Sequence, residues 1–145
     1  MVTTTKPYVH TPPTFAIYVV GLMTEWIESH GGLTGIQKRN EAKAKLLYDT
    51  IDSSSGFYHC PVERDSRSLM NVVFRVAGRN GQSAATKPDE AAEKEFGKQA
   101  AAAALVGTPG HRSVGGMRVS LYNAVELAAV EALTSFMRDF QRKRG

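Results

Sequence analysis

The residues best suited to chemistry lie in one short stretch, which runs from Gly110 to Arg118 with the sequence GHRSVGGMR. It brings an imidazole (His111) and two guanidinium groups (Arg112 and Arg118) close together along the chain. Arginine presents a planar fork of donors that fits a carboxylate or a phosphate through two parallel hydrogen bonds. Because the glycines allow close approach of the backbone, the stretch suits a ligand with two anionic ends. A glycine-rich turn with two solvated arginines is the alternative that spacing alone leaves open.

The composition is that of one ordinary globular domain. The chain has 145 residues, of which 42% are hydrophobic and 22% are charged, with a mild net charge of +4. The densest positive cluster is at the C-terminal end, where cations complement the dipole of an expected helix, so we expect no nucleic-acid partner.

The single cysteine fits a reducing compartment, and the hydropathy of the chain argues against a membrane span. Cys60 is the single cysteine, so no internal disulfide forms, and no Cys/His cluster has the spacing of a metal site. The most apolar run, Phe15 to Ile27, is interrupted by Thr24 and Glu25 and is too short to span a bilayer. We therefore expect no metal, no membrane partner and a cytoplasmic location.

Helical spacing organises the first part of the chain. Prolines in a first turn and the Gly31-Gly32 pair predict a helix from about Pro13 to His30. Its apolar stripe includes Phe15, Val19, Leu22 and Trp26, which assigns Trp26 to the core. A second helix is expected from Leu33 to Asp52. Its apolar stripe would be Leu33, Ile36, Ala44, Leu47 and Ile51, and its solvated face Lys38, Arg39, Glu41, Lys43 and Lys45.

The rest of the chain alternates strands and helices. Strands are predicted at Phe57–Cys60, at Ser68–Val76, and from Met117 to Tyr122, the last with Arg118 opposite its buried residues. Between them lies a loop with an Asn80-Gly81 turn. Helices are predicted over Asp89–Ala104 and Val125–Arg142, the second capped by Asn123, with the stripe Val125, Ala129, Ala132, Leu133, Phe136, Met137 and Phe140. Four helices and three short strands predict an α+β fold, in which a small antiparallel or mixed sheet is covered by helices.

Several stretches, taken in order, resemble the C-terminal part of the phosphoserine aminotransferases, which are pyridoxal-phosphate-dependent class-V aminotransferases. They are TPPTF at 11–15, GGL at 31–33, KAKLLY at 43–48, GFY at 56–58, RSLMNVVF at 67–74 and GHRSVGGMRVSLYNA at 110–124. The resemblance implies the C-terminal domain of a fold-type-I pyridoxal-phosphate transferase. It divides the chain into a lead-in segment, 1–10, and the small domain, 11–145, without the large domain that carries the cofactor and its lysine.

The resemblance also implies roles for individual residues. Arg118 matches the arginine that holds the substrate α-carboxylate, and His111 and Arg112 match the pair that binds the phosphate or distal carboxylate. Thr11 matches a residue that reaches the cofactor phosphate across a homodimer. His10 stands where the family usually has asparagine, and an imidazole can donate to phosphate with a different geometry.

No residue of the chain is expected to be catalytic. The sequence Gly35-Ile36-Gln37-Lys38 superficially resembles the family signature around the cofactor-bound lysine. Lys38, however, falls on the charged face of an amphipathic helix, where lysine is ordinarily solvated. It also follows the Thr-Pro-Pro stretch, whereas the family lysine precedes it.

Two functional hypotheses remain. In the first, the chain is part of a phosphoserine transaminase of L-serine biosynthesis, which converts glutamate and 3-phosphohydroxypyruvate to 2-oxoglutarate and O-phosphoserine, or takes a related 4-phosphohydroxy substrate. The chain alone would then be inactive. In the second, it is a non-catalytic truncated module that dimerises with itself or with a full-length subunit, since exposed apolar surface drives association.

Overall fold

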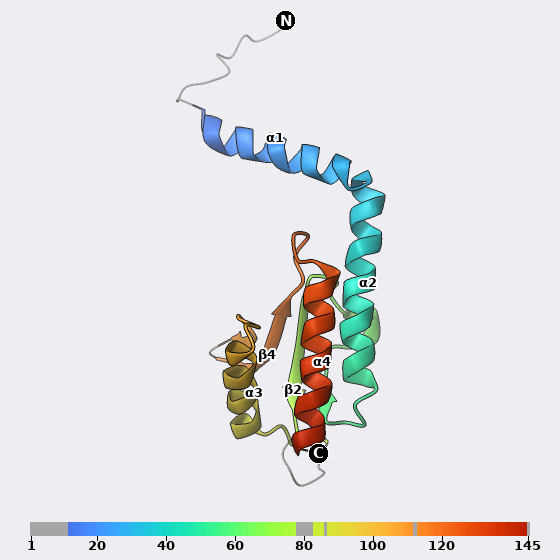
Figure 1. Cartoon of the computed structure of the whole chain (residues 1–145), viewed down its shortest axis with the longest axis vertical. Coiled ribbons are helices and arrows are strands. Elements are labelled where there is room, and N and C mark those ends of the chain that lie inside the picture. The colour runs from blue at the N-terminus through green and yellow to red at the C-terminus, as the bar shows by residue number, and fades with distance from the viewer. Residues whose placement is uncertain (1–11, 78–82, 86, 112, 145) are drawn as a thin grey trace, which may run out of the picture. The chain divides into compact units, whose positions relative to one another are not determined.

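The computed structural model describes residues 12–77, 83–85, 87–111 and 113–144 (Figure 1). Its elements are α1 (Thr14–Ser29), α2 (Gly32–Asp52), β1 (Tyr58–His59), the short 3-10 helix η1 (Arg64–Ser66), β2 (Asn71–Val76), α3 (Glu90–Ala102), β3 (Pro109–His111), β4 (Gly115–Ser120) and α4 (Leu127–Arg144). The predicted α+β fold is confirmed, with one strand, β3, that the sequence did not reveal. The predicted Asn80-Gly81 turn lies outside the described residues.

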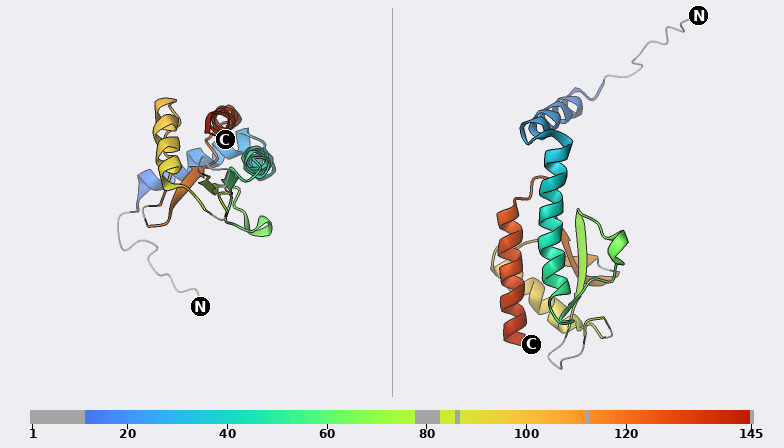
Figure 2. Two further views of the ribbon diagram at one scale, coloured as in Figure 1. Left: turned by 90° about the horizontal axis from the view of Figure 1, so that it is seen from below. Right: turned by 90° about the vertical axis from the view of Figure 1, so that its right-hand side faces the viewer.

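The strands form one antiparallel sheet in the order β1-β2-β4-β3. Strands β2 and β4 pair along most of their length, with Val73 opposite Arg118 and Phe74 opposite Met117. Figure 2 shows α4 and the part of α2 after residue 37 side by side on one face of this sheet. The alternation predicted for β2 is confirmed, because its Val72, Phe74 and Val76 are buried on the helix side.

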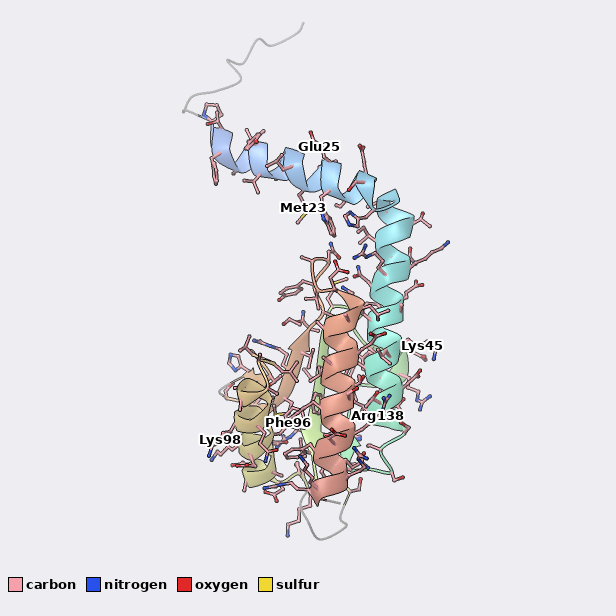
Figure 3. All side chains as sticks on the ribbon, in the orientation of Figure 1. Met23, Glu25, Lys45, Phe96, Lys98 and Arg138 are labelled. Carbon is pink, nitrogen blue, oxygen red and sulfur yellow. The ribbon has the colours of Figure 1, made fainter. Side chains whose placement is uncertain are left out.

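An aromatic cluster joins the sheet to the helices. Phe96 of α3 points toward α4 (Figure 3), and its ring centroid lies 5.1 Å from that of Phe140 and 5.7 Å from that of Phe74. The Tyr58 hydroxyl donates a 2.8 Å hydrogen bond to the Met137 carbonyl, which links β1 to α4. Burial raises the pKa of the Tyr58 phenol far above its usual range. These edge-to-face contacts hold both flanking helices against the sheet.

Local capping explains where α3 begins and ends. The Asp89 carboxylate accepts hydrogen bonds from the backbone N–H groups of Ala91 (2.8 Å) and Ala92 (3.2 Å), as an N-cap does. At the other end, Ala104 adopts the left-handed conformation with φ of 61°. The Leu105 N–H then donates to the Ala100 carbonyl, which closes the helix.

Helix α4 differs from its prediction in where it begins and in some of the residues that it buries. Helix α4 begins at Leu127, because residues 122–125 form a turn and the Asn123 side chain accepts from Asn40 rather than capping the helix. On α4, Val130 and Thr134 are buried, whereas the predicted core residues Ala129 and Ala132 are exposed.

The two compact units of the chain are residues 1–37 and 38–145. In the first, α1 forms as predicted, but none of its residues is buried. Its exposed apolar residues include Phe15, Ile17, Tyr18, Val20, Leu22 and Met23. The assignment of Trp26 to a core is therefore wrong for this chain; its ring is half-buried and stacks on His30 instead. Leu33 on α2 is likewise 80% exposed.

We expect the exposed apolar surface of α1 to make the chain self-associate, because burying such surface is favourable. The double variant Ile17→Glu/Val20→Glu should weaken this association at least about tenfold, since two buried aliphatic side chains contribute about 1.5–3 kcal/mol each. Sedimentation equilibrium at several protein concentrations measures the effect. Thr24→Glu, which places one such charge on a polar position of α1, is the control. A wild-type chain that stays monomeric at every concentration would contradict the prediction.

Candidate functional site

The predicted anion-binding stretch folds as the hairpin of β3 and β4. His111 pairs with Gly115 and Pro109 pairs with Met117, so the two strands run antiparallel through the glycine-rich sequence. Beyond the paired residues, the Arg118 N–H donates a 2.8 Å hydrogen bond to the Thr108 carbonyl. The two ends of the stretch are therefore held together by backbone hydrogen bonds.

Two glycines make this hairpin possible. A Cβ at Gly110 would lie 2.2 Å from the carbonyl oxygen of Gly115, so the strands approach too closely for any side chain there. Gly116 has φ of 71°, and a Cβ on it would lie 2.9 Å from Cδ of Arg75. The glycine-rich pattern thus reflects backbone packing in this hairpin, whatever the ligand.

Arg118 is chemically uncommitted. Its side chain is exposed and, within the described part of the chain, has no ion pair or hydrogen bond. Every other arginine that the structure describes has a side-chain partner. Arg118 and Thr108 are among the residues that line a cavity of about 510 Å³. The Thr108 hydroxyl is buried and has no hydrogen-bond partner among the described residues.

His111 lies on the other side of the sheet. Its register with Gly115 puts it on the same face as Met117, the side of α3, whereas Arg118 alternates to the opposite face. The His111 Nδ1 atom lies 2.7 Å from the Ser113 hydroxyl oxygen and accepts from the Ser113 N–H at 3.3 Å. His111 lines a cavity of about 580 Å³ with Lys94 and Lys98 of α3. The structure therefore does not bring His111 and Arg118 into one cavity.

The other predicted binding residues, His10, Thr11 and Arg112, lie outside the described residues. Their roles remain predictions from the resemblance.

Sequence reasoning missed one buried charge near the hairpin. Lys43 was expected on the solvated face of α2, yet it is 2% exposed. Its ammonium donates to three backbone carbonyls, those of Leu121 (3.1 Å), Tyr122 (2.8 Å) and Val125 (2.9 Å). Burial, together with the charge of nearby Arg39, lowers the pKa of Lys43. The three donors of the ammonium match the three acceptors, so this charge is fully hydrogen-bonded.

Two neighbours of Lys43 on α2 also bind the segment between β4 and α4. The Arg39 guanidinium donates to both carboxylate oxygens of Glu126, at 2.9 and 3.0 Å. Asn40 donates a 2.8 Å hydrogen bond to the side chain of Asn123. The segment between β4 and α4 is thus tied to α2 at several points, and Arg118 precedes that segment by three residues.

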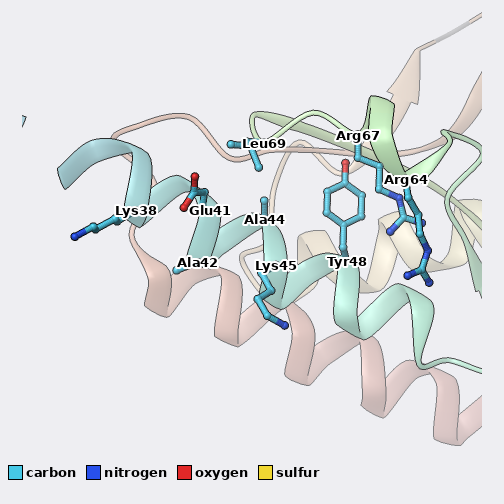
Figure 4. A pocket seen from close by; sticks show the side chains of 9 residues that line it. All are labelled: Lys38, Glu41, Ala42, Ala44, Lys45, Tyr48, Arg64, Arg67 and Leu69. Carbon is cyan, nitrogen blue, oxygen red and sulfur yellow. The ribbon is translucent and has the colours of Figure 1, made fainter. Parts of the chain in front are cut away.

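A third cavity, of about 530 Å³, lies beside α2 (Figure 4). Its arginines are used structurally, since Arg67 donates at 2.9 Å to both carboxylate oxygens of Asp52 and its guanidinium lies 4.6 Å from the Tyr48 ring centroid. The hydrogen bond from Arg67 lowers the pKa of the Asp52 carboxyl. Lys38 is exposed and points away from Tyr48, Arg64 and Arg67, as its predicted place on the charged face requires.

The profile of the family Aminotransferase class-V matches residues 3–133 of this chain. The chain belongs to the class-V aminotransferases. This family agrees with the resemblance found in the sequence, and the chain spans about a third of the length of the curated relatives it matches.

Those relatives are phosphoserine aminotransferases. The one from Lysinibacillus sphaericus is 54% identical over 134 residues, which are 92% of this chain and 34% of the relative. The one from Drosophila melanogaster is 50% identical over 133 residues, or 92% of this chain and 35% of the relative.

Solved structures agree with this. The phosphoserine aminotransferase of Bacillus circulans subsp. alkalophilus has 49% identity and a TM-score of 0.84, covering 94% of this chain and 35% of that one. The pyridoxal-phosphate-bound enzyme of Trichomonas vaginalis has 37% identity and a TM-score of 0.77, covering 90% and 34%.

The two lysines of α2 that the sequence and the burial single out do not fit a cofactor-bound lysine, which needs a free amine inside a pocket. The buried Lys43 is committed to three carbonyls, and Lys38 is exposed and points away from Tyr48, Arg64 and Arg67. No three His, Cys, Asp or Glu side chains among the described residues converge as a metal ion would require. None of the described helices has the length and apolar content that crossing a bilayer requires.

We expect Lys43→Met to lower the free energy of unfolding by about 2–4 kcal/mol, because it leaves buried carbonyls without donors. Lys45→Met is the control, since Lys45 is exposed on the same helix and pairs with Asp49 at the surface. Urea unfolding followed by circular dichroism measures both variants. Equal midpoints for the two would show that the buried ammonium does not stabilise the chain.

Proposed function

We propose that this chain is the substrate-holding part of a phosphoserine aminotransferase. The complete enzyme would transfer the amino group of glutamate to 3-phosphohydroxypyruvate, giving 2-oxoglutarate and O-phosphoserine for L-serine biosynthesis. The observation that carries the proposal is the uncommitted guanidinium of Arg118, in a chain 54% identical to such an enzyme. An exposed arginine kept free of internal partners is available to an external carboxylate.

The proposed roles follow the two anionic ends of the substrates. Arg118 holds the α-carboxylate through two parallel hydrogen bonds. His111 and Arg112 hold the phosphate of phosphoserine or the distal carboxylate of glutamate. The Ser113 contacts at His111 Nδ1 support this role, because they leave Nε2 to face a ligand.

Pyridoxal phosphate is the cofactor that we propose for the complete enzyme, where it would act as the electron sink for amino transfer. Its lysine would come from the large domain that the resemblance implies, since neither Lys38 nor Lys43 fits it. His10 and Thr11 would reach the cofactor phosphate across a homodimer. We propose a cytoplasmic location, as expected for a biosynthetic enzyme of this type.

The 145-residue chain alone should show no transaminase turnover with glutamate and 3-phosphohydroxypyruvate, because Lys43 is committed to backbone carbonyls and Lys38 is exposed on the charged face of α2. Incubation with pyridoxal phosphate, borohydride reduction and peptide mass mapping tests the same point. We expect weak scatter over surface lysines. Stoichiometric labelling of one lysine, Lys38 above all, would refute this prediction.

Arg118→Gln should weaken binding of O-phospho-L-serine and of glutamate by at least about tenfold, because it removes a charge-assisted bidentate contact. Titrations followed by heteronuclear NMR measure the affinities of the 145-residue chain. Arg142→Gln is the matched control, since Arg142 is exposed on the last turn of α4. Unchanged affinity of the Arg118 variant for both ligands would exclude the proposed carboxylate site.

A second candidate function is a non-catalytic module that associates with itself or with a full-length subunit. The exposed apolar residues of α1 favour it. The two candidates differ in ligand binding, since association of this kind needs no free Arg118.

A further inference from the structure

Helix α3 lies alongside strand β3 and runs in the opposite direction. A Cβ built on Gly97 would lie 3.6 Å from Cγ of Pro109, at the start of β3. One turn earlier, Glu93 accepts a 3.2 Å hydrogen bond from the N–H of Gly116, which adjoins the residue that pairs with His111. Four helix residues rise about 6 Å and two strand residues about 7 Å, so the two spans match. The part of α3 near residue 93 is therefore level with His111.

The α3 lysine at this level is Lys94. It is exposed and, within the described part of the chain, has no ion pair or hydrogen bond. Lys94, Lys98 and His111 line one cavity of about 580 Å³. Lys98 lies one turn further along α3, at the level of Pro109, and Figure 3 shows it on the side of the helix turned away from Phe96 and α4. An unpaired ammonium thus lies on the turn of α3 that faces the imidazole.

The acidic side chains of the cavity leave this ammonium unpaired. Glu93 is 6% exposed and is neutralised by Arg75, whose Nε and Nη2 atoms donate to it at 2.6 and 3.3 Å. The N–H groups of Val76, at 3.3 Å, and of Gly116 complete its hydrogen bonds, and both lie beyond the last residue pair of β2 and β4. Glu90 lines the cavity too, yet it forms no ion pair with a described residue.

His111 supplies a directed donor. The Ser113 N–H donates to its Nδ1 at 3.3 Å, so the proton of a neutral ring is on Nε2. Such a ring donates one hydrogen bond to a carboxylate or to a phosphate alike. A phosphate monoester carries about −1.5 to −2 charges near pH 7, whereas a carboxylate carries a single charge. A lysine beside the imidazole therefore distinguishes the two ligands, because its Coulomb attraction increases with the charge of the ligand.

We propose that Lys94 is a specificity-determining residue, whose ammonium contacts the phosphate bound at His111 and favours a phosphate monoester over a carboxylate there. The inference rests on the proposed function, which assigns His111 to either anion. The site lies on the α3 side of the sheet and is independent of Arg118, which lies on the opposite face. Lysine suits this role, because it binds phosphate as a point charge without a fixed geometry.

The test uses methyl phosphate and acetate, which present the two anionic groups without a second end. The 145-residue chain is titrated at about pH 7.5, where the phosphate monoester is mainly a dianion. The NMR signals of the His111 ring and of the amides of β3 and β4 give the affinity at this site. We expect wild type to bind methyl phosphate more tightly than acetate. Lys94→Gln should weaken methyl phosphate about fivefold and acetate less than about twofold, because the lost charge acts more strongly on the dianion.

Lys98→Gln is the matched control, because it removes the same charge from the same cavity one turn further along α3. Its affinities for both ligands should change less than about twofold. Lys94→Arg is measured in parallel. It keeps the charge at the position that we propose, so it should keep the preference for methyl phosphate.

An equal loss of both ligands in Lys94→Gln, or no loss of either, would overturn the inference and leave the proposed function intact. The same holds if wild type binds methyl phosphate at His111 no better than acetate. An equally large loss in Lys98→Gln would show that the general attraction of the cavity gives the preference, and would overturn the inference as well. If methyl phosphate does not shift the His111 signals of wild type, the proposed role of His111 is wrong and the inference falls with it.

Discussion

Strand β4 depends on two buried charges of opposite sign, one near each of its ends. Glu93 accepts from the Gly116 amide at the start of the strand, and Lys43 donates to the carbonyls that follow its last residue. Burying an ion is costly unless it is fully hydrogen-bonded, and both ions meet this condition. The uncommitted Arg118 lies between the two anchors, on the segment that they fix.

The two anchors come from helices that are distant in the sequence. Lys43 belongs to α2 and Glu93 to α3, and both must be packed against the sheet before their charges reach β4. The aromatic contacts of Phe96 hold α3 in that place. The candidate site is therefore a property of the whole folded unit, because the hairpin sequence alone supplies neither anchor.

Much of the fold could be predicted from the periodicity of apolar residues. That periodicity did not reveal the buried charges. The alternation in β2 identified its buried face correctly, since Val72, Phe74 and Val76 are all in the core. Lys43 was assigned to solvent because a lysine on a charged helix face is ordinarily solvated. Its acceptors are backbone carbonyls about 80 positions away, which no side-chain pattern in the sequence can reveal.

The candidate site could be predicted only in part, because its geometry also depends on contacts between distant parts of the chain. The types and spacing of His111 and Arg118 indicated anion binding, but their opposite faces depend on the pairing of β3, a strand of three residues without a sequence signal. Glu93 looked like an ordinary acidic residue in the first turn of a helix. Its contact with Gly116 depends on where β2 and β4 separate, and that is a tertiary feature.

Both anchors end on main-chain atoms, and this has a consequence for how the chain tolerates change. Any amino acid at positions 121, 122 and 125 supplies the carbonyl that Lys43 needs, so those positions are free to drift as long as their packing is preserved. Lys43 and Glu93 have no such freedom. The architecture thus concentrates mutational sensitivity in two side chains on the helices and leaves the connection next to the proposed anion site open to variation.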